Sequence, residues 1–413
     1  MWFTNVVKPT HRCNLNCVYC YNEDTRHPVM PLNILERTIE QTFLYACSLD
    51  PLTSVDFIWH GGEPMSVGMD FYSKALAIQA KASLHMSYAN SIQTNGTLLD
   101  NRWIDFFKVH NFDVSLSLDG PESLNDSTRR YSGGDGSFRH VMRGIRLLRD
   151  AAIPHGVCVV ISQSNRHRTD EIFDFLVKEQ LPFNIIPLTR SGAALTGYTD
   201  IGIGPDEYAD PWIKLFDRWF DASGNDYVQC TDFVRKSRAI LLGRPTDCIG
   251  QEQCASHHVS TDPDGYVYPC ATLSGDPDWS YGNISEQDLI KLMATPQAIS
   301  SRNRQIDEHC KSCKWQHVCH GGCMSRSIKY FGTHNTRDYY CPSLYRIYDH
   351  IEHKLRQRTG LDLSALPSPN HIDVRPVAEA RPLTLRRIGF SRSSLTQIDK
   401  KPSDILFPST LNT

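Results

Sequence analysis

The stretch HRCNLNCVYCYNEDTRH, residues 11–27, places three cysteines, Cys13, Cys17 and Cys20, within eight residues. A structural zinc site has four protein ligands, so these thiols would need His11 as a fourth ligand to form a zinc knuckle. A cubane iron–sulfur cluster takes one thiolate per iron, so three thiolates would leave one iron open to a small molecule. The spacing alone leaves both interpretations open.

The composition is that of a globular protein of more than one domain. The chain has 413 residues, 40% of them hydrophobic and 22% charged, and a net charge of −3. This charge gives no overall attraction to nucleic acid or membrane, and no apolar run is long enough to span a bilayer. The start of the chain lacks a signal peptide, which predicts a cytoplasmic protein. Its 14 cysteines are clustered, and in a reducing compartment such clusters bind metal more often than they form disulfides.

Residues 1–190 alternate between strand-like and helix-like segments. Six strand-like segments, beginning with FTNVVKP and SVDFIWH, are separated by helical patterns such as NILERTIEQTFLYA, in which apolar residues recur on one face. This alternation predicts a parallel sheet with helical crossovers, either an open doubly wound sheet or a partial barrel. In both folds ligands gather at the C-terminal ends of the strands. The cysteine loop is expected there, together with residues 61–64, 94–96 and 119–121.

The rest of the chain divides by composition. Residues 191–247 predict a helical bridge, and residues 248–345 form a loop-rich, cysteine-rich region. Residues 346–363 predict a C-terminal helix. Residues 364–413 are rich in Pro, Ser and Arg without periodicity, which predicts a disordered tail.

Four motifs together resemble the radical S-adenosylmethionine (SAM) superfamily. They are the cysteine triplet with Tyr19 before its last cysteine, HGGEP at residues 60–64, QTNGTLL at 93–99 and SLDGP at 117–121. The resemblance implies a partial (β/α)6 barrel of the TIM type, whose three cysteines hold a [4Fe–4S] cluster. It also implies that SAM chelates the fourth iron and that the reduced cluster cleaves SAM to a 5′-deoxyadenosyl radical, which removes a hydrogen from substrate.

The same resemblance implies which residues contact SAM. Glycines let the backbone approach closely, so the carbonyls of residues 61–64 and the Glu63 carboxylate are expected to receive the SAM ammonium. Ser117 and Arg129 are candidates for the SAM carboxylate and ribose, because an Arg fork can bind two oxygens. The expected cofactor-binding set is Tyr19, Gly61, Gly62, Glu63, Pro64, Asn95, Ser117 and Arg129.

Eight cysteines between residues 248 and 341 are enough for two complete four-thiolate sites. Their spacing, which includes CKSCKWQHVCHGGC at residues 310–323, is similar to the SPASM extension of radical SAM enzymes that modify peptides and proteins. The similarity implies two auxiliary [4Fe–4S] clusters; two zinc sites are the alternative, because CxxC pairs also bind zinc. The implied ligands are Cys248, Cys254, Cys270 and Cys323 for the cluster nearer the active site, and Cys310, Cys313, Cys319 and Cys341 for the outer one.

The sequence leaves three alternative functions for this chain. FIWHGGEP and SLSLDGPESLNDSTR look most like maturases of ribosomally made peptides that form cyclophanes, joining an aromatic ring carbon to the β-carbon of a nearby residue. An anaerobic sulfatase-maturing enzyme, which oxidises Cys or Ser to formylglycine, is the alternative. Those enzymes commonly carry an Asp that acts as the base directly after the cysteine that corresponds to Cys270, which lies at the end of an expected β-hairpin. This chain has Ala271 at that position. A non-catalytic iron–sulfur or zinc scaffold is the third.

The maturase interpretation also sets the expected partners. They are a precursor peptide and a low-potential electron donor, flavodoxin or ferredoxin. The catalytic base is not identifiable from the sequence.

Overall fold

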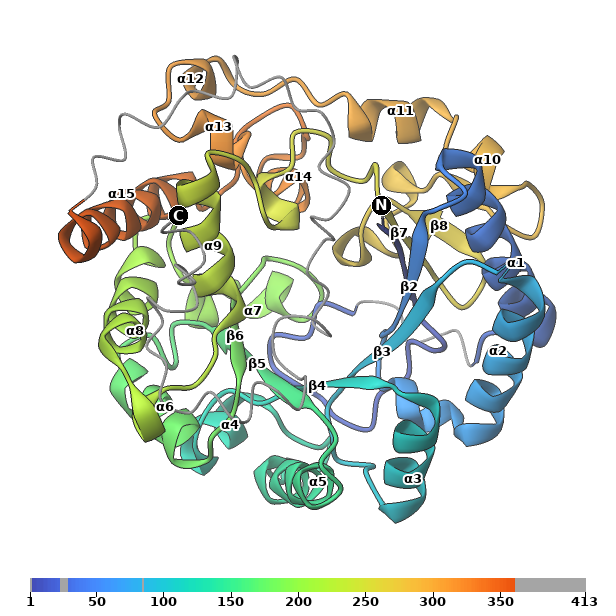
Figure 1. Cartoon of the computed structure of the whole chain (residues 1–413), viewed down its shortest axis with the longest axis horizontal. Coiled ribbons are helices and arrows are strands. Elements are labelled where there is room, and N and C mark those ends of the chain that lie inside the picture. The colour runs from blue at the N-terminus through green and yellow to red at the C-terminus, as the bar shows by residue number, and fades with distance from the viewer. Residues whose placement is uncertain (1, 23–28, 84, 361–413) are drawn as a thin grey trace, which may run out of the picture.

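The computed structural model describes residues 2–22, 29–83 and 85–360, and its core is a wall of parallel strands (Figure 1). Each of the first six strands pairs with its neighbours in sequence, in the order β6–β5–β4–β3–β2–β1. A doubly wound sheet would reverse its strand order at a switch point, so the expected partial barrel is confirmed. The six strands are β1 (Trp2–Val7), β2 (Ser54–Trp59), β3 (Tyr88–Thr94), β4 (Asp113–Ser117), β5 (His155–Ile161) and β6 (Phe183–Pro187).

Helices cover the outer face of this wall (Figure 1). Alternate residues of β1 and β2 are fully buried against them, and the residues between face inward and are only partly buried. The reason is that successive side chains of a strand point to opposite faces. The crossover helices are α1 (Leu32–Leu49), α2 (Met69–Ala82), α3 (Asn101–His110), α4 (Glu122–Thr128), α5 (Phe138–Asp150) and α6 (Thr169–Lys178).

Local sequence sets the bounds of α3, which follows one of the strand-end motifs. The Asp100 carboxylate accepts a hydrogen bond from the Trp103 amide at 3.0 Å, which caps the first turn. Asn111 ends the helix in a left-handed conformation, at a φ of 52°, which Asn tolerates better than most residues. The motif at residues 93–99 is therefore held between a strand and a capped helix.

The cysteine-rich region extends the same sheet on the other side of β1. Strand β7 (His258–Thr261) pairs parallel with β1, and β8 (Tyr266–Tyr268) and β9 (Gly282–Asn283) follow antiparallel. The turn between β7 and β8 contains Gly265 at a φ of 89°, as a tight Asp-Gly turn requires. Because this hairpin lies beside β1, it brings Cys270 to the strand-end loop that carries the first cysteine triplet.

Helices after β6 surround the cysteine-rich loops. The last helix, expected at residues 346–363, is α15 (Cys341–Thr359); it begins earlier because Pro342 suits a first helical turn. The expected tail at 364–413 lies outside the described residues, and no helix within them is long and apolar enough to cross a membrane. The remaining helices are α7 (Ala194–Ile201), α8 (Ala209–Asp221), α9 (Thr231–Leu242), α10 (Leu289–Leu292), α11 (Pro296–Arg302), α12 (Glu308–Lys311), α13 (Gln316–Cys319) and α14 (Met324–Phe331).

Candidate active site

The loop after β1 brings the thiols of Cys13, Cys17 and Cys20 together. Backbone hydrogen bonds of 2.6 and 3.0 Å tie residues 16 and 18 of this loop to residues 130 and 128, at the C-terminal end of α4. Burial raises the pKa of Cys13 to about 12, and the charges of Glu63, Cys17 and Cys20 add to the rise. Mutual repulsion of this kind means that the three thiols share one small volume.

Four buried side chains next to the cysteine loop are joined by hydrogen bonds. The Tyr19 hydroxyl donates to the Asp119 carboxylate, and Arg129 donates to the Tyr19 oxygen at 2.9 Å. Thr128 donates to the same carboxylate at 2.9 Å. Burial raises the pKa of Cys17, whereas the nearby Arg129 charge lowers it. Tyr19 and Arg129, both expected to contact SAM, therefore lie beside the cysteines, and Asp119 anchors them.

Asp119 was not among the site residues predicted from the sequence. Its place in the SLDGP motif, directly after a strand, was the available signal. Ser117, the expected SAM contact in this motif, lies at the end of β4, where its hydroxyl accepts a hydrogen bond from Gln93 at 3.1 Å.

The glycine loop after β2 packs directly on the cysteine loop. The amides of Gly62 and Glu63 donate to the Thr10 and Arg12 carbonyls, at 2.9 and 2.8 Å. A Cβ added at Gly62 would lie 2.2 Å from the Arg12 oxygen, and one at Gly61 would lie 2.4 Å from the Thr10 oxygen. These glycines are required because no side chain fits between the two loops.

The Glu63 carboxylate faces a neighbouring loop. It is fully buried and accepts hydrogen bonds from the Met65 amide (3.0 Å), the Thr94 hydroxyl (2.6 Å) and the Asn95 amide (2.8 Å). Burial raises the pKa of Glu63, and these donors oppose the rise. Glu63 thus joins the loops after β2 and β3, and the expected contact with the SAM ammonium remains a prediction. Pro64 follows as the first residue of a short 3-10 turn.

Asn95 connects the third motif to the cysteines. Its side-chain amide donates to the Asn14 oxygen at 2.8 Å and lies 3.6 Å from the Cys13 sulfur. The motifs at the ends of β1, β2, β3 and β4 therefore converge on one site, as expected for parallel strands whose carboxyl ends share an edge.

The other eight cysteines gather in two groups of four. Burial raises the pKa of Cys254, and the next causes are the charges of Cys248, Cys323 and Cys270. The pKa of Cys319 is raised by burial and by nearby charges, including those of Cys341, Cys310 and Cys313. The sequence predicts the same two sets as cluster ligands, and that ligand role stays a prediction. No group of three or more His, Cys, Asp or Glu residues within the described chain is arranged to hold a single metal ion.

A buried ion pair lies between these two groups. The Arg326 side chain donates to both oxygens of Asp338, and the same carboxylate accepts the Cys323 amide at 2.8 Å. The Asp338 charge raises the pKa of Cys319, and Cys323 is among the groups that raise the pKa of Arg326. Arg326 and Asp338 thus position cysteines from both groups.

A third cluster of charged groups joins the hairpin to the first cysteine loop. The Lys8 ammonium donates to the Ala271 carbonyl at 3.1 Å and lies 4.0 Å from the Asp262 carboxylate. His11 lies 3.4 Å from the other oxygen of Asp262. All three side chains are almost fully buried. The zinc-knuckle interpretation needs His11 as a ligand, whereas its imidazole is engaged here with Asp262 and, at 2.6 Å, with the Asn22 side chain.

The donor sets fit iron–sulfur clusters and SAM. Thiols whose pKa is raised by burial become thiolates when a metal core binds, because the positive charge of the core stabilises the anion that burial disfavours. Gly61 and Gly62 let the loop after β2 lie directly on the backbone of the cysteine loop, which brings residues 61–64 next to the expected cluster.

Comparison with protein families agrees with this arrangement. Residues 7–176 match the radical SAM superfamily, and residues 248–314 match the SPASM iron–sulfur cluster-binding domain. The chain is 30% identical over 319 residues to the serine-type anaerobic sulfatase-maturating enzyme of Klebsiella aerogenes, covering 75% of this chain and 76% of that protein. It is 29% identical over 352 residues to the cysteine-type enzyme of Clostridium novyi (strain NT), covering 82% and 92% of the two chains.

Solved structures share the fold. One is anSMEcpe with bound S-adenosylmethionine and the Cp18Cys peptide, with 25% identity, a TM-score of 0.77, and coverage of 87% of this chain and 99% of that one. Another is Streptococcus suis SuiB bound to its precursor peptide SuiA, with 20% identity, a TM-score of 0.57, and coverage of 82% and 75%. The chain belongs to the radical SAM superfamily and is a SPASM-containing enzyme that acts on peptides or proteins, with [4Fe–4S] clusters and SAM as cofactors.

Proposed function

We propose that this enzyme crosslinks a ribosomally made precursor peptide, joining an aromatic ring carbon to the β-carbon of a nearby residue to form a cyclophane. The position after the hairpin cysteine carries this proposal. Sulfatase maturases commonly have an Asp base there, and this chain has Ala271, whose methyl group cannot accept a proton. The Ala271 backbone carbonyl accepts a hydrogen bond from the Lys8 ammonium at 3.1 Å, which holds this position beside the first cysteine loop.

Conversion of a sulfatase Cys or Ser to formylglycine is the second candidate. The curated relatives at about 30% identity are sulfatase-maturating enzymes, which favours it. Asp262 also offers a carboxylate close to the hairpin cysteine, although the ion pairs with Lys8 and His11 engage it. Under this candidate, Asp262 would be expected to take the place of the missing base.

Each group of residues has a distinct part in the proposed reaction. We propose that Cys13, Cys17 and Cys20 hold the SAM-binding cluster, and that the two sets of four cysteines hold the auxiliary clusters. When bound, the cluster and SAM would supply a 5′-deoxyadenosyl radical that removes one hydrogen atom from the β-carbon; after ring addition the ring hydrogen would leave as a proton, and an auxiliary cluster would accept the remaining electron. Asp119, through Tyr19 and Arg129, holds the cysteine loop in place.

Surroundings and electron supply are part of the same proposal. We propose that the enzyme acts in the cytoplasm and receives its electrons from flavodoxin or ferredoxin. Neither nucleic acid nor membrane is an expected partner. The many free cysteines suit a reducing compartment.

Peptide mass spectrometry separates the two candidates. Short reading frames next to the gene would be co-expressed anaerobically with this chain, and the peptide products fragmented. A crosslink predicts the loss of two hydrogens, with fragmentation suppressed between an aromatic residue and its neighbour, and no loss when that aromatic residue is replaced by Ala. An unmodified precursor, together with formylglycine in a sulfatase-derived peptide, would overturn the crosslinking proposal and support the second candidate.

A further inference from the structure

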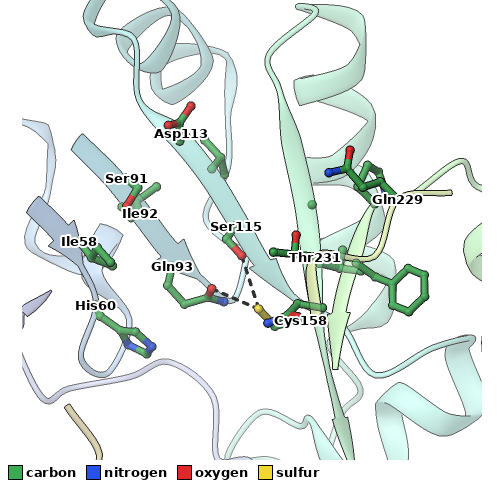
Figure 2. Close-up of a pocket in the computed structure, with 16 residues that line it drawn as sticks. Ile58, His60, Ser91, Ile92, Gln93, Asp113, Ser115, Cys158, Gln229 and Thr231 are labelled. Carbon is green, nitrogen blue, oxygen red and sulfur yellow. Dashed lines mark hydrogen bonds between the residues drawn. The ribbon is translucent and has the colours of Figure 1, made fainter. Parts of the chain in front are cut away.

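The inner face of the barrel wall encloses a cavity of about 200 Å³ (Figure 2). It is lined by the inward-facing residues of β2 to β6, and it adjoins the strand-end loops, because His60 directly precedes the glycine loop. The lining includes Ile58, His60, Gln93, Ser115, Cys158 and Asn184. This volume is sufficient for one aromatic side chain, because a cavity of about 150 Å³ already binds benzene.

Most polar groups on one wall of the cavity bind one another. The Cys158 thiol lies 3.6 Å from both the Gln93 oxygen and the Ser115 hydroxyl, as the dashed lines in Figure 2 show. The Gln93 amide in turn donates to Ser117, the residue expected to contact SAM. These groups are satisfied without a ligand, and much of the remaining lining is apolar, from residues such as Ile58 and Phe183.

Asn184 is the exception. It lies on β6, paired in register with Cys158, and its side-chain oxygen is buried with no hydrogen-bond partner among the residues that the structure describes. A buried acceptor without a donor is costly and rare in native proteins. The oxygen therefore points to a ligand that brings an N–H or O–H group into a mostly apolar cavity.

We propose that this cavity binds the aromatic side chain of a Trp or Tyr in the peptide substrate, whose indole N–H or phenol O–H donates to Asn184. The inference rests on the proposed peptide-modifying function and extends it by naming the side chain that the barrel holds. Apolar walls with one well-placed polar group are typical of a small-molecule site. The bound ring lies next to Gln93, which links the cavity to Ser117, so it is held close to the expected SAM site.

Small aromatic probes test this proposal on the intact holoenzyme without turnover. Indole and benzofuran have nearly the same shape, but only indole has an N–H donor. Their affinities would be measured anaerobically by ligand-observed NMR titration. We expect indole to bind about five- to tenfold more tightly, the effect of one net hydrogen bond.

Matched variants locate the binding site. In Asn184→Leu, which removes the acceptor at similar size, the preference for indole should disappear, whereas Asn184→Asp should retain it. Cys158→Leu, which fills the cavity, should weaken both probes, and Cys158→Ala should not. Ser115→Leu fills the cavity from a neighbouring strand and provides a second test if Cys158→Leu fails to fold, as judged by its urea-unfolding midpoint.

The outcomes separate this inference from the proposed function. Equal affinities for the two probes, or a preference that survives Asn184→Leu, would overturn the Asn184 assignment. Unweakened binding in both cavity-filling variants would overturn the site. Because no reaction is needed, the probes can bind as expected even if the precursor peptide emerges unmodified, and crosslinking can succeed even if the probes fail to bind.

Discussion

Replacing Gly62 by Ala should separate the glycine loop from the cysteine loop. The new Cβ would lie 2.2 Å from the Arg12 oxygen and 2.4 Å from the His11 oxygen, whereas ordinary contacts begin at 3.4 Å. Both obstacles are backbone atoms, so the two loops must move apart by about 1 Å. The expected cost in stability is about 1–3 kcal/mol, typical of overpacking. A shift of about 1 Å near reacting groups can lower a rate about 100-fold.

The assay is the initial rate of 5′-deoxyadenosine formation with a chemical reductant under anaerobic conditions, and iron content is measured on the same samples. Gly133→Ala is the matched control, because nothing lies within 4 Å of the position where its Cβ would be added. We expect the control to stay within about twofold of wild type, as for an open surface site. A Gly62→Ala enzyme with wild-type iron and a wild-type rate would refute the view that the two loops must touch.

Further predictions concern the cysteines, the buried ion pair and a buried histidine. Cys17→Ala should abolish 5′-deoxyadenosine formation, because it removes one of the three expected ligands, and wild-type output would contradict that role. Cys313→Ala should lower the iron content and leave SAM cleavage detectable; unchanged iron would count against an outer-cluster ligand. Asp338→Ala leaves the buried Arg326 charge unpaired, so anaerobic urea unfolding should show a loss of about 3–5 kcal/mol. Replacing the pair together by Arg326→Met and Asp338→Leu should recover only part of that loss, because the Cys323 amide still lacks its acceptor. A single-variant loss below about 1 kcal/mol would exclude a strong pair. Burial and a nearby lysine charge lower the pKa of His60 from 6.5 to about 4. The unfolded chain then binds the proton first, so stability should fall as the pH drops from about 6.5 toward 4. Urea midpoints of His60→Gln should lack this part of the pH dependence, and an identical slope would argue against a neutral, buried His60.

Ala271 is the position at which this chain departs from the pattern expected of a sulfatase maturase. One residue after the hairpin cysteine removes the expected base, while the sequence elsewhere still matches sulfatase-maturating relatives. The structure adds that Lys8, the residue directly after β1, binds the backbone at this position, from a segment more than 260 residues away in sequence.

The sequence by itself determined the strand–helix alternation and the cysteine spacing, because both are encoded locally. The alternation left a doubly wound sheet and a partial barrel open; the resemblance to the radical SAM superfamily favoured the barrel, which the strand order confirms. The division of the later cysteines into two sets of ligands stays a prediction. The last helix was also expected, although its start at Cys341 was not, because boundaries depend on first-turn residues such as Pro342.

Only the tertiary structure decided which polar groups meet. Asp119 binds Tyr19 across 100 residues, and Glu63 turns to the loop after β3. Asp338 reaches Arg326 and Cys323, and Asn184 faces a cavity built by five strands. The spacing of residues along the chain does not predict these hydrogen-bonded pairs. A buried polar side chain is positioned by its hydrogen-bond partners, and these come together only when the chain has folded.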